Sequence, residues 1–165
     1  MASYPTLLSE LAKIPGVRLW PEIKVDQTTE QNHRFVARLT EYGLLSGSTI
    51  TSFSGERLVA IRAAALDLGP TNVTTLLYEA GQPTAWSDVA TYHVQEIGPS
   101  YYTVNTPDFI SNARAGGLAV AVYNADRATR WAEVTNLGVD NIITRYPDAA
   151  QKWQQTVPPP ALGDS

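Results

Sequence analysis

The sequence has no cysteine among its 165 residues, which excludes disulfide bonds, thiolate metal ligands and a cysteine nucleophile. Long apolar runs are also missing: none approaches the roughly 20 residues that cross a bilayer, and the N-terminus lacks the pattern of a signal peptide. Lysine and arginine number 12 against 16 acidic residues, the net charge is -4, and no basic run occurs. We therefore expect no nucleic-acid partner, and the compartment stays open.

What the chain does have is the composition of an ordinary globular domain. Hydrophobic residues make up 44% of the sequence and charged residues 17%, which is typical of a folded rather than a disordered chain. The length is sufficient for one domain with a sizeable core. We assign residues 1–150 to that domain. Residues 151–165 are expected to hold the end of a C-terminal helix and a Pro-rich flexible tail.

Six short strand-like segments alternate with helical patterns. They span residues 18–24, 48–53, 73–78, 94–100, 118–123 and 141–144. Their starts lie roughly 20–30 residues apart, which is typical of strands joined by crossover helices. Since each strand, helix and following strand forms a right-handed crossover, this order predicts an all-parallel sheet.

The helical patterns between these segments begin at recognisable cap residues. The predicted caps are Thr28 or Thr29, Ser54, Thr106-Pro107 and Asp126, and further helices are predicted over residues 6–14 and 84–92. This periodicity fits an open doubly wound sheet and a TIM barrel equally well. No G-x-G-x-x-G or Walker loop follows the first strand, so dinucleotide and P-loop sites are excluded.

Seven short motifs decide between these architectures. In chain order they are Tyr4-Pro5-Thr6-Leu7-Leu8, Trp20-Pro21-Glu22-Ile23-Lys24, Ser52-Phe53-Ser54, Leu76-Leu77-Tyr78, Pro99-Ser100-Tyr101, Val122-Tyr123-Asn124 and Gly138 to Asp148. Their order and spacing resemble those of the glycerophosphodiester phosphodiesterase family of TIM-barrel enzymes. The chain departs from the family at Gly98, where the family has Asn, and at Arg145, where it has an acidic residue. The resemblance implies an incomplete TIM barrel of about six parallel strands with alternating helices.

The resemblance also implies that part of the family's site lies outside this sequence. Family members carry His-Arg-Gly on the first strand, then a Glu-x-Asp metal pair and a His-Asp motif around the second strand. These all precede the motif that begins here at Tyr4. We therefore expect the family's first two strands to be lacking, and we assign no residue of this chain a catalytic role.

Four site positions are retained by resemblance. Glu22 stands at a metal-ligand position, Lys24 at a phosphate-contacting position, and Phe53 and Tyr123 at the pocket walls. Family members hydrolyse a phosphodiester with Ca²⁺ or Mg²⁺ held by three carboxylates, while two histidines act as acid and base. One carboxylate cannot hold such a hard cation tightly, so the ion is implied by resemblance without a complete ligand set.

The two histidines of this chain do not replace the family's pair. His33 and His93 fall on helical patterns. Sites of TIM barrels are built at the carboxyl ends of the strands, so we expect both histidines to have surface or structural roles.

Two functions of different classes stay open. One is a metal-dependent hydrolase of small glycerol phosphodiesters, such as deacylated phospholipids, that is inactive as this chain alone. The other is a non-catalytic structural or interaction module that keeps the barrel scaffold. An unrelated parallel α/β protein is a third alternative. Because a barrel fragment would expose strand edges and apolar surface, we expect self-association or a partner chain that completes the barrel.

Overall fold

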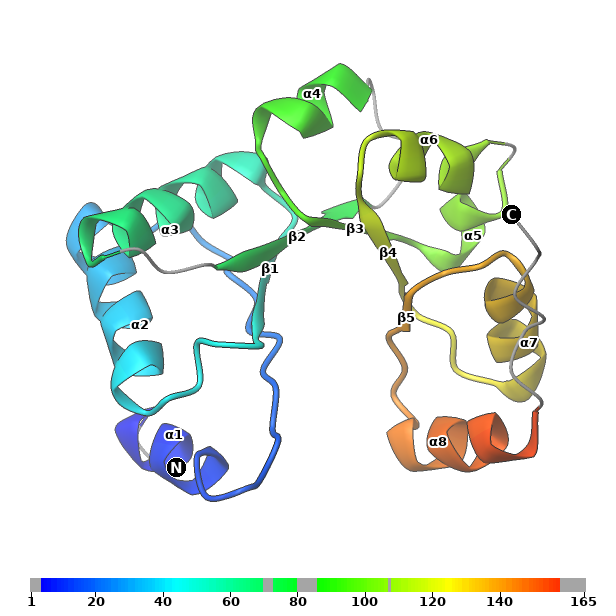
Figure 1. Ribbon diagram of the computed structural model, residues 1–165, viewed down its shortest axis with the longest axis horizontal. Coiled ribbons are helices and arrows are strands. Elements are labelled where there is room, and N and C mark those ends of the chain that lie inside the picture. The colour runs from blue at the N-terminus through cyan, green and yellow to red at the C-terminus, as the bar shows by residue number, and fades with distance from the viewer. Residues whose placement is uncertain (1–3, 70–72, 80–85, 107, 158–165) are drawn as a thin grey trace. The chain divides into compact units, whose positions relative to one another are not determined.

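The computed structural model describes residues 4–69, 73–79, 86–106 and 108–157 (Figure 1). The chain divides into two compact units. The first comprises Met1–Tyr78 and Ser87–Gln95, and the second comprises Glu79–Trp86 and Glu96–Ser165. In the described residues, five strands alternate with helices, and the pairs β1–β2, β3–β4 and β4–β5 run parallel. Within each unit the strands lie in the order of the chain.

The first unit is built around strands β1 and β2. Its elements are α1 (Tyr4–Leu11), α2 (Thr29–Glu41), β1 (Thr49–Ser52), α3 (Gly55–Asp67), β2 (Thr74–Glu79, whose last residue belongs to the second unit) and most of α4 (Trp86–Thr91). Helices α2 and α3 lie side by side (Figure 1). The core between helices and strands consists of apolar side chains, among them Val36, Leu39, Ile50, Leu58, Ile61 and Leu76.

Two predicted helix caps of this unit are confirmed. Helix α2 begins after a capping box, in which Thr28 Oγ1 accepts from Gln31 N at 3.2 Å and Gln31 Oε1 accepts from Thr28 N at 2.8 Å. Helix α3 begins after Ser54, whose hydroxyl accepts from Arg57 N at 3.4 Å. Both caps satisfy backbone N–H groups that a helix leaves unpaired in its first turn.

The predicted strand over residues 18–24 is an extended segment with a single β-bridge, from Glu22 to Thr51. Leu19 O and Pro21 O accept from Thr49 N and Thr51 N, and Ile23 N donates to Thr51 O. Proline has no N–H, so Pro21 cannot make the remaining ladder bond to β1. This segment and the five strands together account for the six predicted segments.

The second unit continues the alternation of strands and helices. Its elements are β3 (Glu96–Pro99), α5 (Tyr101–Val104), α6 (Phe109–Ala115), β4 (Ala119–Val122), α7 (Ala128–Asn136), β5 (Asn141–Ile142) and α8 (Pro147–Thr156). Strand β4 lies between β3 and β5. The core of the second unit includes Ile97, Val104, Phe109, Val120, Val122, Trp131 and Val134.

One predicted cap of this unit is wrong. Helix α7 starts at Ala128 after Arg127, and no side chain caps it. The Asp126 carboxylate instead accepts the backbone N–H of Arg145 at 2.9 Å and pairs with the Arg145 guanidinium at 2.7 Å. The loop after β5 therefore uses the carboxylate that the sequence pattern assigned to the helix.

Several boundaries differ from the predictions or lie outside the described residues. Helix α6 starts at Phe109, and the predicted opening residue Pro107 is outside the described ranges. The same holds for residues 84 and 85 of the helix predicted over 84–92, and for residues 158–165 of the predicted tail. Helix α8 crosses position 150, and the division of the chain there stays a prediction.

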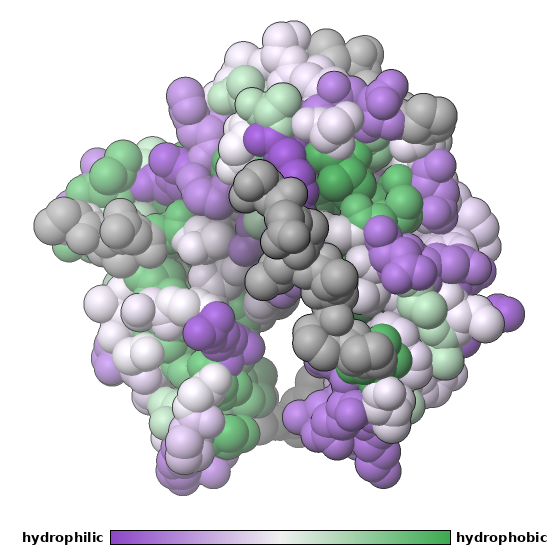
Figure 2. Space-filling model, turned by 45° about the vertical axis from the view of Figure 1, so that its right-hand side comes forward, coloured by the Kyte–Doolittle hydropathy of each residue, from purple (hydrophilic) through white to green (hydrophobic). Residues whose placement is uncertain are grey.

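The surface is mixed in character. Figure 2 shows apolar residues lying among hydrophilic ones on the face in view. Large apolar side chains that are exposed include Val25, Phe53, Leu66, Leu68 and Tyr102. Every helix within the described ranges is too short or too polar to cross a bilayer.

Candidate functional site

Glu22 and Lys24 form the centre of the candidate site in the first unit. They flank Ile23, which is buried, so the alternation of an extended chain turns both charged side chains to the opposite face. Lys24 Nζ lies 3.5 Å from Glu22 Oε2, and the exposed fractions of the two side chains are 74% and 28%. The pairing is consistent with their position on one face of the segment, while the roles of metal ligand and phosphate contact stay predictions.

The neighbouring end of β1 is fixed to this segment by hydrogen bonds. Ser52 Oγ donates to Ile23 O at 2.8 Å and accepts from Ser54 N at 3.1 Å. Phe53 therefore follows β1 beside the Glu22 segment, with half of its side chain exposed. Its ring lies 5.0 Å from the ring of Tyr78, centroid to centroid, at the carboxyl end of β2. Such an aromatic pair can form a pocket wall.

A second anchor holds the chain after Lys24. Arg57 on α3 donates to Lys24 O at 2.9 Å and pairs with Asp26 at 2.7 Å. The guanidinium is largely covered, whereas the Asp26 carboxylate is exposed. The backbone that carries Glu22 and Lys24 is thus bonded on one side to β1 and on the other to α3.

Tyr123 belongs to the second unit, where it follows β4. Its hydroxyl donates to Glu79 O at 3.0 Å, and the same carbonyl accepts from Ser100 N at 3.1 Å. Tyr123 therefore lies beside Glu79, the last residue of β2, whose carbonyl is also bonded to Ser100 after β3. Tyr123 belongs to a different unit from Glu22, Lys24 and Phe53, which belong to the first.

Glu79 is a site candidate that the sequence analysis missed. Burial raises the pKa of its carboxyl group above the ordinary value. Groups whose pKa is displaced by burial at the carboxyl end of a barrel strand are candidates for binding or proton transfer. The sequence feature that could have indicated Glu79 is its position directly after the motif Leu76-Leu77-Tyr78. Its burial depends on contacts distant in sequence and could not be inferred from that motif.

Two further aromatic residues of the second unit, Tyr101 and Tyr102, pack against a cation. Arg130 on α7 lies 4.4 Å from the ring centroid of Tyr101 and 5.4 Å from that of Tyr102. It also donates to the Tyr102 hydroxyl at 3.0 Å. The Tyr101 hydroxyl donates to Glu133, and this bond raises the pKa of Tyr101. These contacts show that the two rings pack on α7.

Neither histidine lies at the carboxyl end of a strand. His33 on α2 has its Nε2 3.0 Å from Asp67 Oδ2, next to the end of α3. His93 follows α4 with a φ of +51°, and its carbonyl accepts from Gln95 Nε2 at 2.9 Å. Both positions agree with surface or structural roles.

The described side chains do not fit a divalent cation on their own. Within the described ranges, no three His, Cys, Asp or Glu side chains gather closely enough to hold a metal ion. Glu22 supplies one carboxylate, and Lys24 already pairs with it. Ca²⁺ and Mg²⁺ require several oxygen ligands, so further carboxylates would have to join Glu22 before such an ion could bind there.

Comparison with solved structures establishes the fold. A glycerophosphodiester phosphodiesterase from Parabacteroides distasonis ATCC 8503 superposes with a TM-score of 0.75 at 19% identity, covering 92% of this chain and 63% of that chain. A second one, from Agrobacterium tumefaciens str. C58, gives a TM-score of 0.67 at 18% identity, covering 92% and 62%. This chain thus spans less than two-thirds of either structure. Its parallel strands and alternating helices form an incomplete TIM barrel, as the sequence predicted.

Likeness of fold does not by itself establish the family. A mandelate oxidase mutant matches with a TM-score of 0.62 at 15% identity, covering 89% of this chain and 57% of that chain, because the same fold carries many chemistries. No curated protein matches the sequence. The sequence profile of the glycerophosphoryl diester phosphodiesterase family, however, matches residues 3–149. That match covers most of the sequence, and the chain therefore belongs to the glycerophosphoryl diester phosphodiesterase family.

Proposed function

We propose that this chain is one part of a hydrolase of small glycerol phosphodiesters, and that it does not hydrolyse them alone. In this proposal Glu22 supplies one metal-ligand position, Lys24 contacts the phosphate, and Phe53 and Tyr123 are apolar walls. The observation that carries the proposal is the pair of Glu22 and Lys24 on one face of a strand segment in a member of this family.

The geometry of the pair suits contact with an anion. Lys24 is largely exposed, and the 3.5 Å separation from Glu22 is longer than a strong charge-assisted hydrogen bond. Lysine carries three rotatable donors on a flexible stem, so its ammonium can reach a phosphate oxygen while it stays near the carboxylate. The bonds from Ser52 and Arg57 hold the backbone on both sides of this lysine.

The expected inactivity follows from proton transfer. A positioned acid or base contributes about 10²–10⁴-fold to the rate. The two histidines that could act as acid or base, His33 and His93, lie on α2 and after α4, and neither lies at the carboxyl end of a strand. We propose that the missing proton-transfer groups and the missing carboxylates are supplied by polypeptide outside these 165 residues.

A second candidate is a non-catalytic module that retains the scaffold. The observation that favours it is that the Glu22 carboxylate is already ion-paired, which would lower its tendency to accept a cation. The two candidates differ in whether Lys24 still binds phosphate. The test is the affinity for glycerol 3-phosphate, measured by calorimetry. An affinity that falls in Lys24→Met but not in Lys152→Met supports the partial hydrolase. No binding by the wild type favours the module.

Catalysis is tested on the purified full chain with glycerophosphocholine or bis-p-nitrophenyl phosphate, in Ca²⁺ or Mg²⁺ and in chelator. We expect product formation equal to the buffer blank in every condition. Turnover that needs the metal, disappears in Glu22→Gln and persists in Glu41→Gln would contradict the inactivity and indicate a working site. Glu41 is a suitable control because it lies on α2 and pairs with Arg38.

A further inference from the structure

A small polar pocket lies in the first unit, where helices α2 and α3 begin. Its volume is about 120 Å³, which leaves room for an ion and a few water molecules. Its polar lining consists of Asp26, Gln27, Asn32, Glu56 and Arg57. All five residues belong to the first unit. The pocket is thus formed by the segment that follows Lys24 together with the first turns of two helices.

The side chain of Asn32 is a buried amide that faces this pocket. Asn32 is only 4% exposed and is part of the pocket lining. Within the part of the chain that the structure describes, no side chain or backbone group forms a hydrogen bond with this amide. A buried amide normally pairs both its oxygen and its NH₂ group, because unpaired polar groups cost free energy. The amide is therefore available to a ligand in the pocket.

Gln27 brings a second amide oxygen to the same pocket. Its Oε1 atom is buried, and among the described residues it has no hydrogen-bond partner. Gln27 directly precedes Thr28, whose capping box holds the backbone at the start of α2. An amide oxygen only accepts, so it requires either a donor or a cation.

The charged groups of the pocket carry one net negative charge. Asp26 and Glu56 supply two carboxylates, and Arg57 supplies one guanidinium, which pairs with Asp26 at 2.7 Å. The pKa of Glu56 is lowered first by the hydrogen bond from the Ser54 hydroxyl, then by a backbone bond and by the Tyr92 hydroxyl, so this carboxylate is ionised at neutral pH. A single positive charge would therefore neutralise the pocket.

The chemistry of the lining favours a monovalent cation over the other small ions. Two carboxylates would repel an anion, and the caps at Thr28 and Ser54 already occupy N–H groups that could attract one. A divalent ion would carry more charge than the lining neutralises. Neutral carbonyl oxygens, in contrast, can replace the hydration shell of K⁺.

We propose that this pocket binds a monovalent metal cation through Gln27 Oε1, the amide oxygen of Asn32 and the carboxylates of Asp26 and Glu56. The ion would join the segment after Lys24 to the first turns of α2 and α3. This site differs from the metal-ligand position at Glu22, and the inference does not depend on the proposed function.

The test follows the side-chain amides of the full chain, labelled with ¹⁵N, during titration with KCl and separately with NaCl. Tetramethylammonium chloride keeps the ionic strength constant, because this bulky cation offers no N–H donor and cannot approach an oxygen closely. We expect saturable chemical-shift changes at the NH₂ groups of Gln27 and Asn32 with at least one of the two metal ions.

Two substitutions locate the ion. Gln27→Met keeps the length of the side chain but removes its oxygen, so the affinity for the ion should fall roughly 2- to 10-fold, as for one lost hydrogen bond. Gln155→Met, at an exposed position of α8, is its control and should bind as the wild type does. Asp26→Asn removes one charge and should weaken binding about 5-fold, the effect of a unit charge about 4 Å away in a water-like dielectric.

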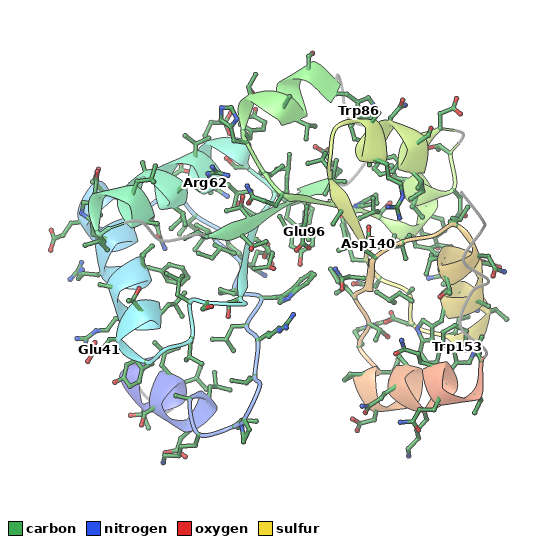
Figure 3. All side chains as sticks on the ribbon, viewed as in Figure 1. Glu41, Arg62, Trp86, Glu96, Asp140 and Trp153 are labelled. Atoms are coloured by element: carbon green, nitrogen blue, oxygen red, sulfur yellow. The ribbon has the colours of Figure 1, made fainter. Side chains whose placement is uncertain are left out.

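Asp26→Asn also serves if Gln27→Met fails to fold, because the Asp26 side chain is 90% exposed. Its matched control is Glu41→Gln. Glu41 pairs with Arg38 at 2.6 Å, much as Asp26 pairs with Arg57. Figure 3 labels Glu41 at the end of α2, whereas the pocket lies at the start of that helix. Glu41→Gln should therefore leave the affinity unchanged.

Shifts that do not saturate with either metal ion would overturn the inference, as would unchanged affinity in both Gln27→Met and Asp26→Asn. Water alone would then pair with the two amides. Glu22→Gln should bind the ion as the wild type does, and loss of binding in that variant would assign the ion to Glu22 instead. The experiment contains no phosphodiester and no divalent metal. Its failure is therefore distinguishable from failure of the proposed function, which is measured by glycerol 3-phosphate binding at Lys24.

Discussion

Replacing Asp126 by alanine should lower the free energy of unfolding by about 2 kcal/mol, because its carboxylate holds the loop after β5. The side chain is 12% exposed and accepts from Arg145 N at 2.9 Å and from the Thr144 hydroxyl at 3.3 Å. It also pairs with the Arg145 guanidinium at 2.7 Å. The substitution removes all three contacts and leaves the backbone N–H of Arg145 without this acceptor.

The magnitude can be divided between the backbone bond and the ion pair. A hydrogen bond to a charged group contributes about 1.5–3 kcal/mol. The Arg145 side chain is 72% exposed, and an ion pair of that kind contributes only about 0.2–1 kcal/mol. Arg145→Met, which keeps the backbone N–H, should therefore cost much less than Asp126→Ala.

The same contact predicts a dependence on pH. The pKa of Asp126 is lowered, first by the hydrogen bond from the backbone N–H of Arg145 and then by the Arg145 side chain, against an opposing effect of burial. A lowered pKa means that the stabilisation is present above the unfolded-state pKa of about 3.9 and is lost as the pH falls through the lower folded-state value. Asp126→Asn should show a smaller loss of stability over that acidic range.

Urea unfolding followed by circular dichroism at neutral and acidic pH measures these differences, provided that the slope of free energy against urea is unchanged. Equal costs for Asp126→Ala and Arg145→Met would refute the reasoning, since the exposed ion pair would then account for the whole effect. A pH profile of Asp126→Asn that is identical to the wild type would contradict the linkage.

Two further predictions concern helix starts in the first unit. Thr28→Ala should cost about 0.5–2 kcal/mol in urea unfolding through loss of the capping box, while Thr29→Ala should cost less, and equal costs would count against the cap. Gly55→Ala should lower the melting temperature because the added methyl group overlaps the ring of Tyr92, and such overpacking typically costs about 1–3 kcal/mol. Tyr92→Ala in the same chain should relieve that clash, and a Gly55→Ala variant as stable as the wild type would show that the ring moves aside.

Features that depend on neighbouring residues were predictable from the sequence. The Thr28 and Ser54 caps each bond to a residue three positions later, so the sequence pattern contains both partners. Asp126 has the same local pattern, but its partner Arg145 lies 19 residues away. The cap prediction failed because a more distant backbone N–H competes for the same carboxylate.

In the candidate site, too, features set by neighbouring residues were predictable and those set by distant residues were not. The common face of Glu22 and Lys24 follows from the two-residue period of an extended chain and from the burial of Ile23. Burial raises the pKa of Glu79, whose carbonyl is bonded to Ser100 and Tyr123, residues far away in the sequence. The family was predicted from the order of several motifs along the chain, and the match to the family profile confirms it. No single motif could have indicated the family.

Pro21 has a consequence for how the Glu22 segment can be aligned. A shift of one residue along β1 would turn Ile23 outward and bury the two charges, at a high desolvation cost. A shift of two residues in the direction that brings Pro21 to the position of Ile23 would keep the faces but place a proline where Ile23 now donates to Thr51 O. Both nearby alignments are thus penalised, one by solvation and one by a lost donor. The missing N–H that weakens this segment therefore also disfavours the shift that would bring Pro21 to the position of Ile23.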